Sequence, residues 1–167
     1  MSNNKEILKY VSALWGDENT TAIECGERIY DFMMLIKEHN KGLFGVWYEQ
    51  GMSLKEALDK KIDVSQEYFY RQVERNWDKK FPALGSRVAL WTGQKEDGYS
   101  AVISFNLGKH TNNPNLLNSC VVNLPYKGQY AESYKEPANR IALMRLMQAF
   151  WKPDFLKVNG KRIEEIV

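Results

Sequence analysis

The chain has 167 residues, of which 44% are hydrophobic and 26% are charged, an ordinary globular composition that excludes extensive disorder. The net charge of +2 and the dispersed basic residues give no support to direct nucleic-acid binding, and no apolar run reaches the ~20 residues that span a membrane. The length is sufficient for one domain, expected over residues 1–167. The polar start does not fit a signal peptide, so we expect a cytoplasmic protein.

The first half of the chain predicts one strand followed by helices. In residues 7–15, the odd-numbered and the even-numbered positions both carry apolar side chains. This pattern is typical of a central strand buried on both faces. Thr21 begins a capping-box pattern ahead of apolar residues at helical spacing, so we expect a helix over 21–39. Ser53 begins the same pattern before a short helix, and a further helix is expected from 65 to about 76.

In the second half of the chain, the spacing of apolar residues changes from the helical spacing to the alternation that is typical of strands. Residues 87–91 and 99–107 alternate between apolar and polar side chains, which predicts a hairpin with a polar loop from Gly93 to Gly98. Residues 119–124 predict a further strand.

The last part of the chain predicts one helix and a small hairpin. Pro137 fits the first turn of a helix whose apolar residues leave a narrow polar stripe, so we expect that helix to be buried on most sides. Pro153 ends it, and Asn159-Gly160 predicts a turn between two short strands. The order of elements predicts an α+β fold, a mostly antiparallel sheet with helices packed on one side.

No pattern in the sequence predicts catalysis, a cofactor or a metal site. His39 and His110 lie in no recognisable catalytic motif, and solvent exposure is the default expectation for both. Cys25 and Cys120 lack metal-ligand spacing, so we expect buried thiols. We therefore expect a protein that is not an enzyme and that needs no cofactor.

The aromatic content of 13% is unusual, and most of these side chains must be buried. Trp47 and Tyr48 are adjacent, so their side chains point in different directions on an extended segment, and one of them is expected to reach solvent or a groove. Tyr and Trp are common anchors at protein interfaces. We expect the exposed member of Trp47, Tyr48 and Glu49 to contact a partner.

Five short segments, in this order, resemble a known family. They are Trp15-Gly16, the stretch 44–58 (FGVWYEQGMSLKEAL), the stretch 84–93 (LGSRVALWTG), Val121-Val122-Asn123-Leu124-Pro125 and Trp151-Lys152-Pro153-Asp154. Together they resemble the immunity protein 52 family of bacterial polymorphic toxin systems. The resemblance covers nearly the whole chain.

The resemblance implies a protein that binds a secreted toxin domain and neutralises it in the producing cell and its kin. It points to toxins of the restriction-endonuclease fold, delivered by type VI or related secretion systems. The resemblance implies a charged loop at the position of Asp78, so Asp78 is a candidate toxin contact. A solvated turn is the simpler interpretation of this residue. The family tends towards an arginine shortly after the first Trp-Gly, whereas this chain has Asp17-Glu18-Asn19. A contact made by that arginine would not carry over.

The prediction is therefore an immunity protein that inhibits its toxin stoichiometrically, with Trp47, Tyr48, Glu49 and Asp78 as candidate contacts. If the segment around Trp47 is structural, the loop that carries Lys95, Glu96 and Asp97 is the next candidate. Glu49 could meet the basic, DNA-binding surface expected of a nuclease. The alternatives are a small cytoplasmic enzyme with a polar metabolite bound between the sheet and the Trp47 segment, or an adaptor that loads an effector for secretion. The sequence leaves a homodimer open.

Overall fold

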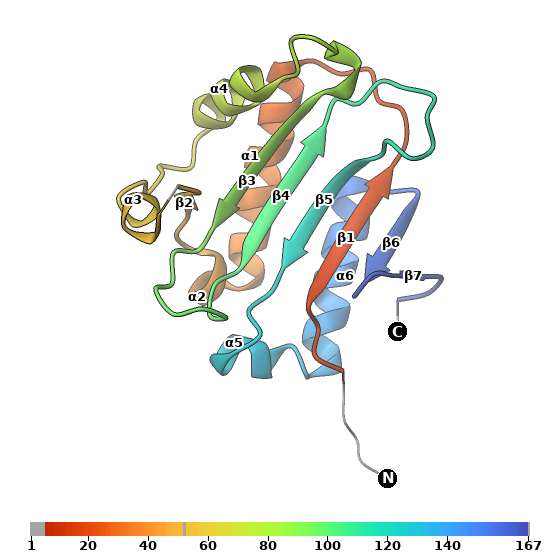
Figure 1. The fold of residues 1–167 in the computed structure, drawn as a ribbon. Coiled ribbons are helices and arrows are strands. Elements are labelled where there is room, and N and C mark those ends of the chain that lie inside the picture. Colours follow the sequence, from red (N-terminus) through yellow and green to blue (C-terminus); the bar gives the residue numbers. More distant parts are fainter. Residues whose placement is uncertain (1–5, 52, 167) are drawn as a thin grey trace.

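Seven strands form one antiparallel sheet in the computed structural model, which describes residues 6–51 and 53–166 (Figure 1). The strands are β1 (Tyr10–Trp15), β2 (Tyr48–Glu49), β3 (Ser86–Trp91), β4 (Val102–Leu107), β5 (Asn118–Asn123), β6 (Phe155–Val158) and β7 (Lys161–Ile163). Their order across the sheet is β2-β3-β4-β5-β1-β6-β7. The first strand of the chain is thus an interior strand, paired with β5 on one side and β6 on the other, as the sequence predicts.

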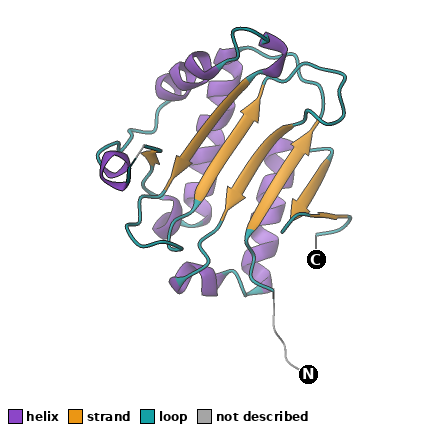
Figure 2. Ribbon diagram, in the orientation of Figure 1, coloured by secondary structure: helices purple, strands orange, loops and turns teal. Residues whose placement is uncertain are grey.

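The helices that cover the sheet lie on one of its faces. The helices are α1 (Ala22–His39), α2 (Lys41–Phe44), α3 (Leu54–Leu58), α4 (Gln66–Asn76), α5 (Gly128–Ser133) and α6 (Pro137–Trp151), with a 3₁₀ turn at Pro82–Leu84. Figure 2 shows α1, α4 and α6 behind the sheet, while no helix of the described residues lies across its front. We call this uncovered side the open face. The predicted α+β class, with helices on one side of an antiparallel sheet, is confirmed.

Local hydrogen bonds explain where three of the helices begin. The side-chain oxygens of Thr21, Ser53 and Ser65 each accept a hydrogen bond from the backbone N–H three residues later, at 3.2, 3.2 and 3.1 Å. Each bond satisfies an N–H that has no partner within the helix. The predicted helix starts are confirmed for α1, α3 and α4.

An aromatic cluster joins the two ends of the chain in the core. The rings of Trp15 and Trp151 stack with centroids 5.1 Å apart, and the guanidinium of Arg28 lies 5.6 and 5.1 Å from those centroids. Glu18 forms an ion pair with Arg28, and the backbone N–H of Gly16 donates to the carboxylate of Asp154 at 2.9 Å. Two of the segments that carry the family resemblance thus form one structural unit.

The last helix differs from its prediction. In α6, Leu143, Met144, Met147 and Trp151 are buried, but Ala142 and Ala149 are exposed together with the charged positions. The helix has only the sheet and the side of α1 to pack against, so its outer side faces solvent. The expectation that it is buried on most sides is wrong, because Ile141, Leu146 and Phe150, which carried the apolar pattern, are only half-buried.

Close packing between α1 and α4 depends on Gly26. A Cβ atom at this position would lie 2.7 Å from the backbone nitrogen and 2.8 Å from the Cα of Tyr70. Replacing Gly26 with alanine should therefore push the helices apart and lower the free energy of unfolding by about 1 to 3 kcal/mol. Denaturant titration followed by circular dichroism measures the loss. Gly16→Ala is the matched control, because its Cβ would meet its nearest atom at an ordinary 3.6 Å. Equal stability of the two variants would contradict this account.

Candidate functional site

A hollow of about 810 Å³ lies on the open face, at the end of the sheet where β3 leads into β4. Its floor is one row of the sheet, in which Trp91 lies opposite Val102, Val102 opposite Asn123, and Asn123 opposite Tyr10. Residues directly opposite in antiparallel strands point to the same side. The pairing register therefore places all four side chains on the open face.

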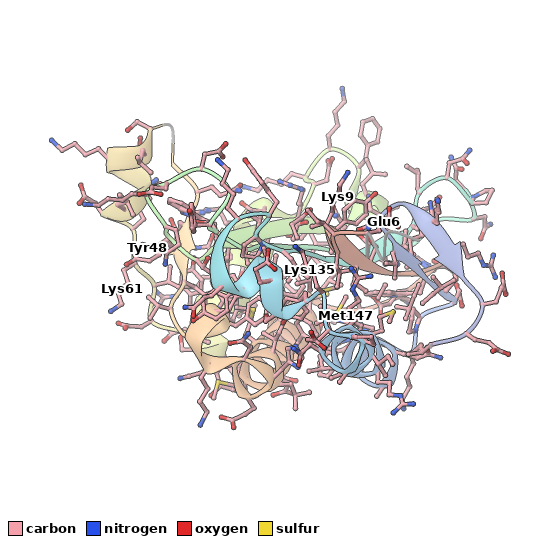
Figure 3. All side chains as sticks on the ribbon, turned by 90° about the horizontal axis from the view of Figure 1, so that it is seen from below. Glu6, Lys9, Tyr48, Lys61, Lys135 and Met147 are labelled. Atoms are coloured by element: carbon pink, nitrogen blue, oxygen red, sulfur yellow. The ribbon has the colours of Figure 1, made fainter. Side chains whose placement is uncertain are left out.

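Four segments surround this floor. The loop from Gly93 to Gly98, which we call the hairpin loop, lies beside Leu54 from α3 and Tyr126 from the segment after β5. Ile7 and Lys9 come from the residues that lead into β1. Figure 3 looks at the sheet from this end and shows Lys9 on the side away from the helices. Tyr126 and Leu54 are 50% and 49% exposed, so the rim presents apolar surface that nothing in the described chain covers.

The hairpin loop is held in one conformation by contacts with Tyr126. The hydroxyl of Tyr126 donates to the carboxylate of Asp97 at 2.6 Å, and this bond raises the pKa of Tyr126. The backbone N–H groups of Tyr126 and Lys127 both donate to the carbonyl of Gly98, at 2.9 and 3.0 Å. Gly98 has a φ of +91°, and a Cβ there would lie 2.8 Å from the Tyr126 ring, so the turn requires glycine. The loop is therefore ordered before any partner arrives.

Lys95, Glu96 and Asp97 are the predicted site residues that the structure brings to the hollow. Tyr48 lies next to this site. It is opposite Trp91 on the open face, with ring centroids 6.2 Å apart, and its half-buried ring packs against Gly93. Tyr48 supports the hairpin loop but does not line the hollow.

Glu49 and Trp47 lie elsewhere. Glu49 faces the helix side, where its carboxylate accepts hydrogen bonds from the Tyr68 hydroxyl at 2.7 Å and from Gln72 at 3.3 Å. Trp47 is only 2% exposed; its ring stacks on Phe44 at 5.9 Å, and its indole N–H donates to the carbonyl of Phe44 at 2.9 Å. Of the two adjacent aromatic residues, Trp47 belongs to the core and Tyr48 is the more accessible, so Trp47 is not the exposed member that was expected to contact a partner.

Asp78 lies at the opposite end of β3 from the hollow. Its carboxylate accepts hydrogen bonds from the backbone N–H groups of Lys80 and Phe81 at 3.0 and 2.7 Å, and its own N–H donates to Gly85. These bonds close the turn that leads into β3. The structure thus gives Asp78 a role in the turn and does not bring it together with the hairpin loop.

The two histidines have separate partners. His39 is half-buried at the end of α1, where its Nε2 lies 2.8 Å from the hydroxyl of Tyr134, and burial lowers the pKa of His39. The default expectation of exposure is wrong for His39, because the C-terminus of α1 packs against the Tyr134 segment. His110 is exposed, and its Nδ1 lies 2.5 Å from Asp17. Cys25 and Cys120 are buried free thiols, as predicted.

The described residues contain neither a metal-binding cluster nor a membrane-spanning helix. No three His, Cys, Asp or Glu side chains within 6–51 and 53–166 gather where they could hold a metal ion. None of the helices in these ranges is both long and apolar enough to cross a membrane.

Sequence reasoning did not single out Tyr126, Leu54 or Ile7. A signal for Tyr126 was present, since an antiparallel strand at 119–124 must end beside the start of the strand at 99–107, next to the hairpin loop. Leu54 and Ile7 carry no such signal, because their proximity to the hollow depends on tertiary packing.

Comparison with known proteins supports the resemblance of the short segments. The family model described as immunity protein 52 matches residues 8–166, which include every strand and helix of the structure. No curated protein sequence gives a significant match to the chain. Because the match extends from before the first strand to beyond the last, the chain belongs to the immunity protein 52 family.

Proposed function

We propose that this chain binds the toxin domain of a cognate antibacterial effector and neutralises it stoichiometrically in the cytoplasm of the producing cell. The observation that carries the proposal is the hollow on the open face, with exposed apolar side chains at its rim and a charged loop beside it. Exposed apolar surface with a polar border is typical of protein-binding sites, and aromatic residues such as Tyr126 are frequent anchors in them.

The order of the hairpin loop favours tight binding. Association has an entropic cost for every loop that must be fixed in the complex, and the bonds from Tyr126 to Asp97 and Gly98 fix this loop in advance. The free energy of contact can then contribute to affinity. An interface of roughly 1,200 to 2,000 Å² would be of standard size for such a complex.

The toxin in this proposal is a nuclease of the restriction-endonuclease fold, delivered by a type VI or related secretion system. This part rests on the family to which the chain belongs. The competing functions are a small enzyme and an effector-loading adaptor, and the experiment below separates all three.

The test uses the toxin domain encoded beside the gene for this protein. Increasing amounts of purified immunity protein are added to a fixed amount of toxin, and cleavage of plasmid DNA is measured. We expect activity to fall linearly and to vanish at an equimolar ratio, because each inhibitor occupies one toxin. Complete inhibition at a small fraction of an equivalent would indicate an enzyme, and a stable complex that still cleaves DNA would indicate an adaptor. Light scattering of the complex gives its stoichiometry, including any homodimer.

A variant with His39→Ala and His110→Ala gives a second test of the same proposal. Neither histidine lies at the hollow, and their partners are Tyr134 and Asp17. We expect the double variant to inhibit the toxin at the same equivalence point as the original protein. A folded double variant that binds the toxin but no longer blocks it would contradict a purely stoichiometric mechanism.

A further inference from the structure

Beyond the hollow, the strand side chains of the open face carry only positive charge. The alternation of side chains along β3, β6 and β7 places Arg87, Lys157 and Arg162 on this side, since their neighbours Val88, Leu156 and Ile163 face the helices. Among the strand residues that the structure describes, no Asp or Glu shares the open face with them.

Two of these cations lie directly opposite each other. Lys157 and Arg162 are cross-strand partners between β6 and β7, an arrangement in which like charges destabilise a sheet. The nearest carboxylate oxygen to Arg162 belongs to Glu164, at 3.7 Å, and the guanidinium lies 4.7 Å from the centroid of Phe155. Within the described residues, Lys157 has no carboxylate at ion-pair distance. The repulsion between the two cations would be relieved by an anionic group placed above them.

Arg87, near the other edge of the sheet, also lacks a carboxylate partner. It is exposed and lies opposite Asn106, a neutral residue, and no carboxylate of the described chain lies within ion-pair distance. Some cations on the helices do have carboxylate partners: Arg71 on α4 pairs with Glu67 at 2.7 Å, and Lys135 pairs with Glu132 at 2.8 Å. Arg87 and Lys157 therefore lack an ion-pair partner within the described residues, and Arg162 has only the exposed Glu164.

One row of the open face that ends at Lys157 consists otherwise of small or medium-sized neutral side chains. Ala89, Ser104, Val121 and Ser12 lie side by side across β3, β4, β5 and β1, and the row continues to Lys157. The charged side chains of the open face therefore lie toward its edges, at Arg87 on β3, Lys157 on β6 and Arg162 on β7, with neutral side chains between them. Charge and shape both favour one broad contact across the whole face.

We propose that the toxin docks across the entire open face and that the toxin surface lying against Arg87, Lys157 and Arg162 is acidic. This inference rests on the proposed function and adds the charge of the partner's surface. A nuclease binds DNA through a basic surface, which these cations would repel. The contact is therefore made with a different surface of the toxin.

The decisive measurement is the rate of association with the toxin domain at low and high salt. For the original protein, we expect the association rate constant to fall about tenfold between 50 and 300 mM NaCl, because complementary charges accelerate encounter and salt screens them. A variant with Arg87→Glu and Lys157→Glu should associate at least tenfold more slowly at 50 mM NaCl, with a dissociation rate that changes much less. Its association rate should be nearly independent of salt or should rise with it.

Arg145→Glu supplies the matched control for the single variant Arg87→Glu. Arg145 is an exposed arginine on the outer side of α6, away from the open face, and the substitution makes the same change in net charge. We expect its association rate to stay within about twofold of the original, since long-range effects of net charge are small at moderate salt. Melting curves confirm that every variant is folded, and Arg87→Gln provides a milder change if Arg87→Glu is not.

A competition experiment tests the predicted location on the toxin. With EDTA present to prevent cleavage, a saturating short DNA duplex should leave the affinity of the immunity protein for the toxin unchanged within about threefold. Displacement by the duplex, or equal association rates for the original protein and the double variant, would overturn the inference while leaving inhibition intact. Tight binding of the duplex by the immunity protein alone, lost in the double variant, would overturn it in favour of nucleic acid as the occupant. Failure of the original protein to bind the toxin at all would instead refute the proposed function.

Discussion

Replacing Trp151 with alanine should lower the free energy of unfolding by about 3 to 5 kcal/mol, the range for removing a large buried aromatic side chain. Trp151 is 3% exposed and lies at the centre of the aromatic cluster. Its ring stacks on Trp15 and lies 5.3 and 6.0 Å from the rings of Phe32 and Phe105, while Arg28 covers it from the side. Alanine would remove the common neighbour of all four side chains and leave a cavity that the strands cannot close.

Equilibrium unfolding in urea, followed by fluorescence and circular dichroism, measures this loss. Trp151→Phe is the informative control, because it keeps a ring in the cluster and removes only the buried indole N–H with its part of the ring system. We expect the phenylalanine variant to lose less than half as much stability as the alanine variant. An alanine variant with unchanged stability but weaker toxin binding would move this end of α6 from the core to the interface.

Replacing Tyr126 with alanine should weaken binding of the toxin by about 2 to 4 kcal/mol, which corresponds to a roughly 30- to 1,000-fold higher Kd. The substitution removes an exposed aromatic side chain from the rim of the hollow. It also removes the hydroxyl that holds Asp97 and the ring that packs on Gly98, so the hairpin loop would have to be ordered during binding. Because half of the side chain is already exposed, we expect a loss of stability below about 1 kcal/mol.

Calorimetry with the toxin domain, together with thermal melting of the free protein, separates the two contributions. Tyr126→Phe keeps the ring and loses only the bond to Asp97, so its loss of affinity reports the order of the loop alone. Tyr99→Ala serves as a control, because Tyr99 is also exposed and close in sequence to the loop but does not line the hollow. If Tyr126→Ala and Tyr99→Ala bind the toxin equally well, the hollow is not the recognition site.

The local patterns of the sequence predicted the elements because each depends on neighbours in the chain. The capping residues Thr21, Ser53 and Ser65 and the alternation over 99–107 report interactions within a few residues, and the structure contains the corresponding helices and strand. The short elements α2, α5 and β2 were not predicted, because they lack a full period of apolar residues. Their conformation depends on tertiary packing.

The candidate site was less predictable, because its geometry depends on tertiary packing and not on neighbours in the chain. Adjacent residues point in different directions on an extended segment, so one of Trp47 and Tyr48 was expected away from the core. That rule cannot say which one, and the choice is made by Phe44, which stacks on Trp47. The hollow collects Ile7, Leu54 and Tyr126 from distant parts of the chain, and no spacing in the sequence encodes that meeting.

The strand order has a consequence for the timing of protection. β1 is made early during synthesis, but its two hydrogen-bonding neighbours are residues 118–123 and 155–158. The centre of the sheet therefore cannot form until most of the chain has left the ribosome, and folding must proceed through contacts between residues far apart in sequence. If the open face is the docking surface, as proposed, a chain that is still being synthesised cannot yet bind the toxin, and protection comes only from completed chains.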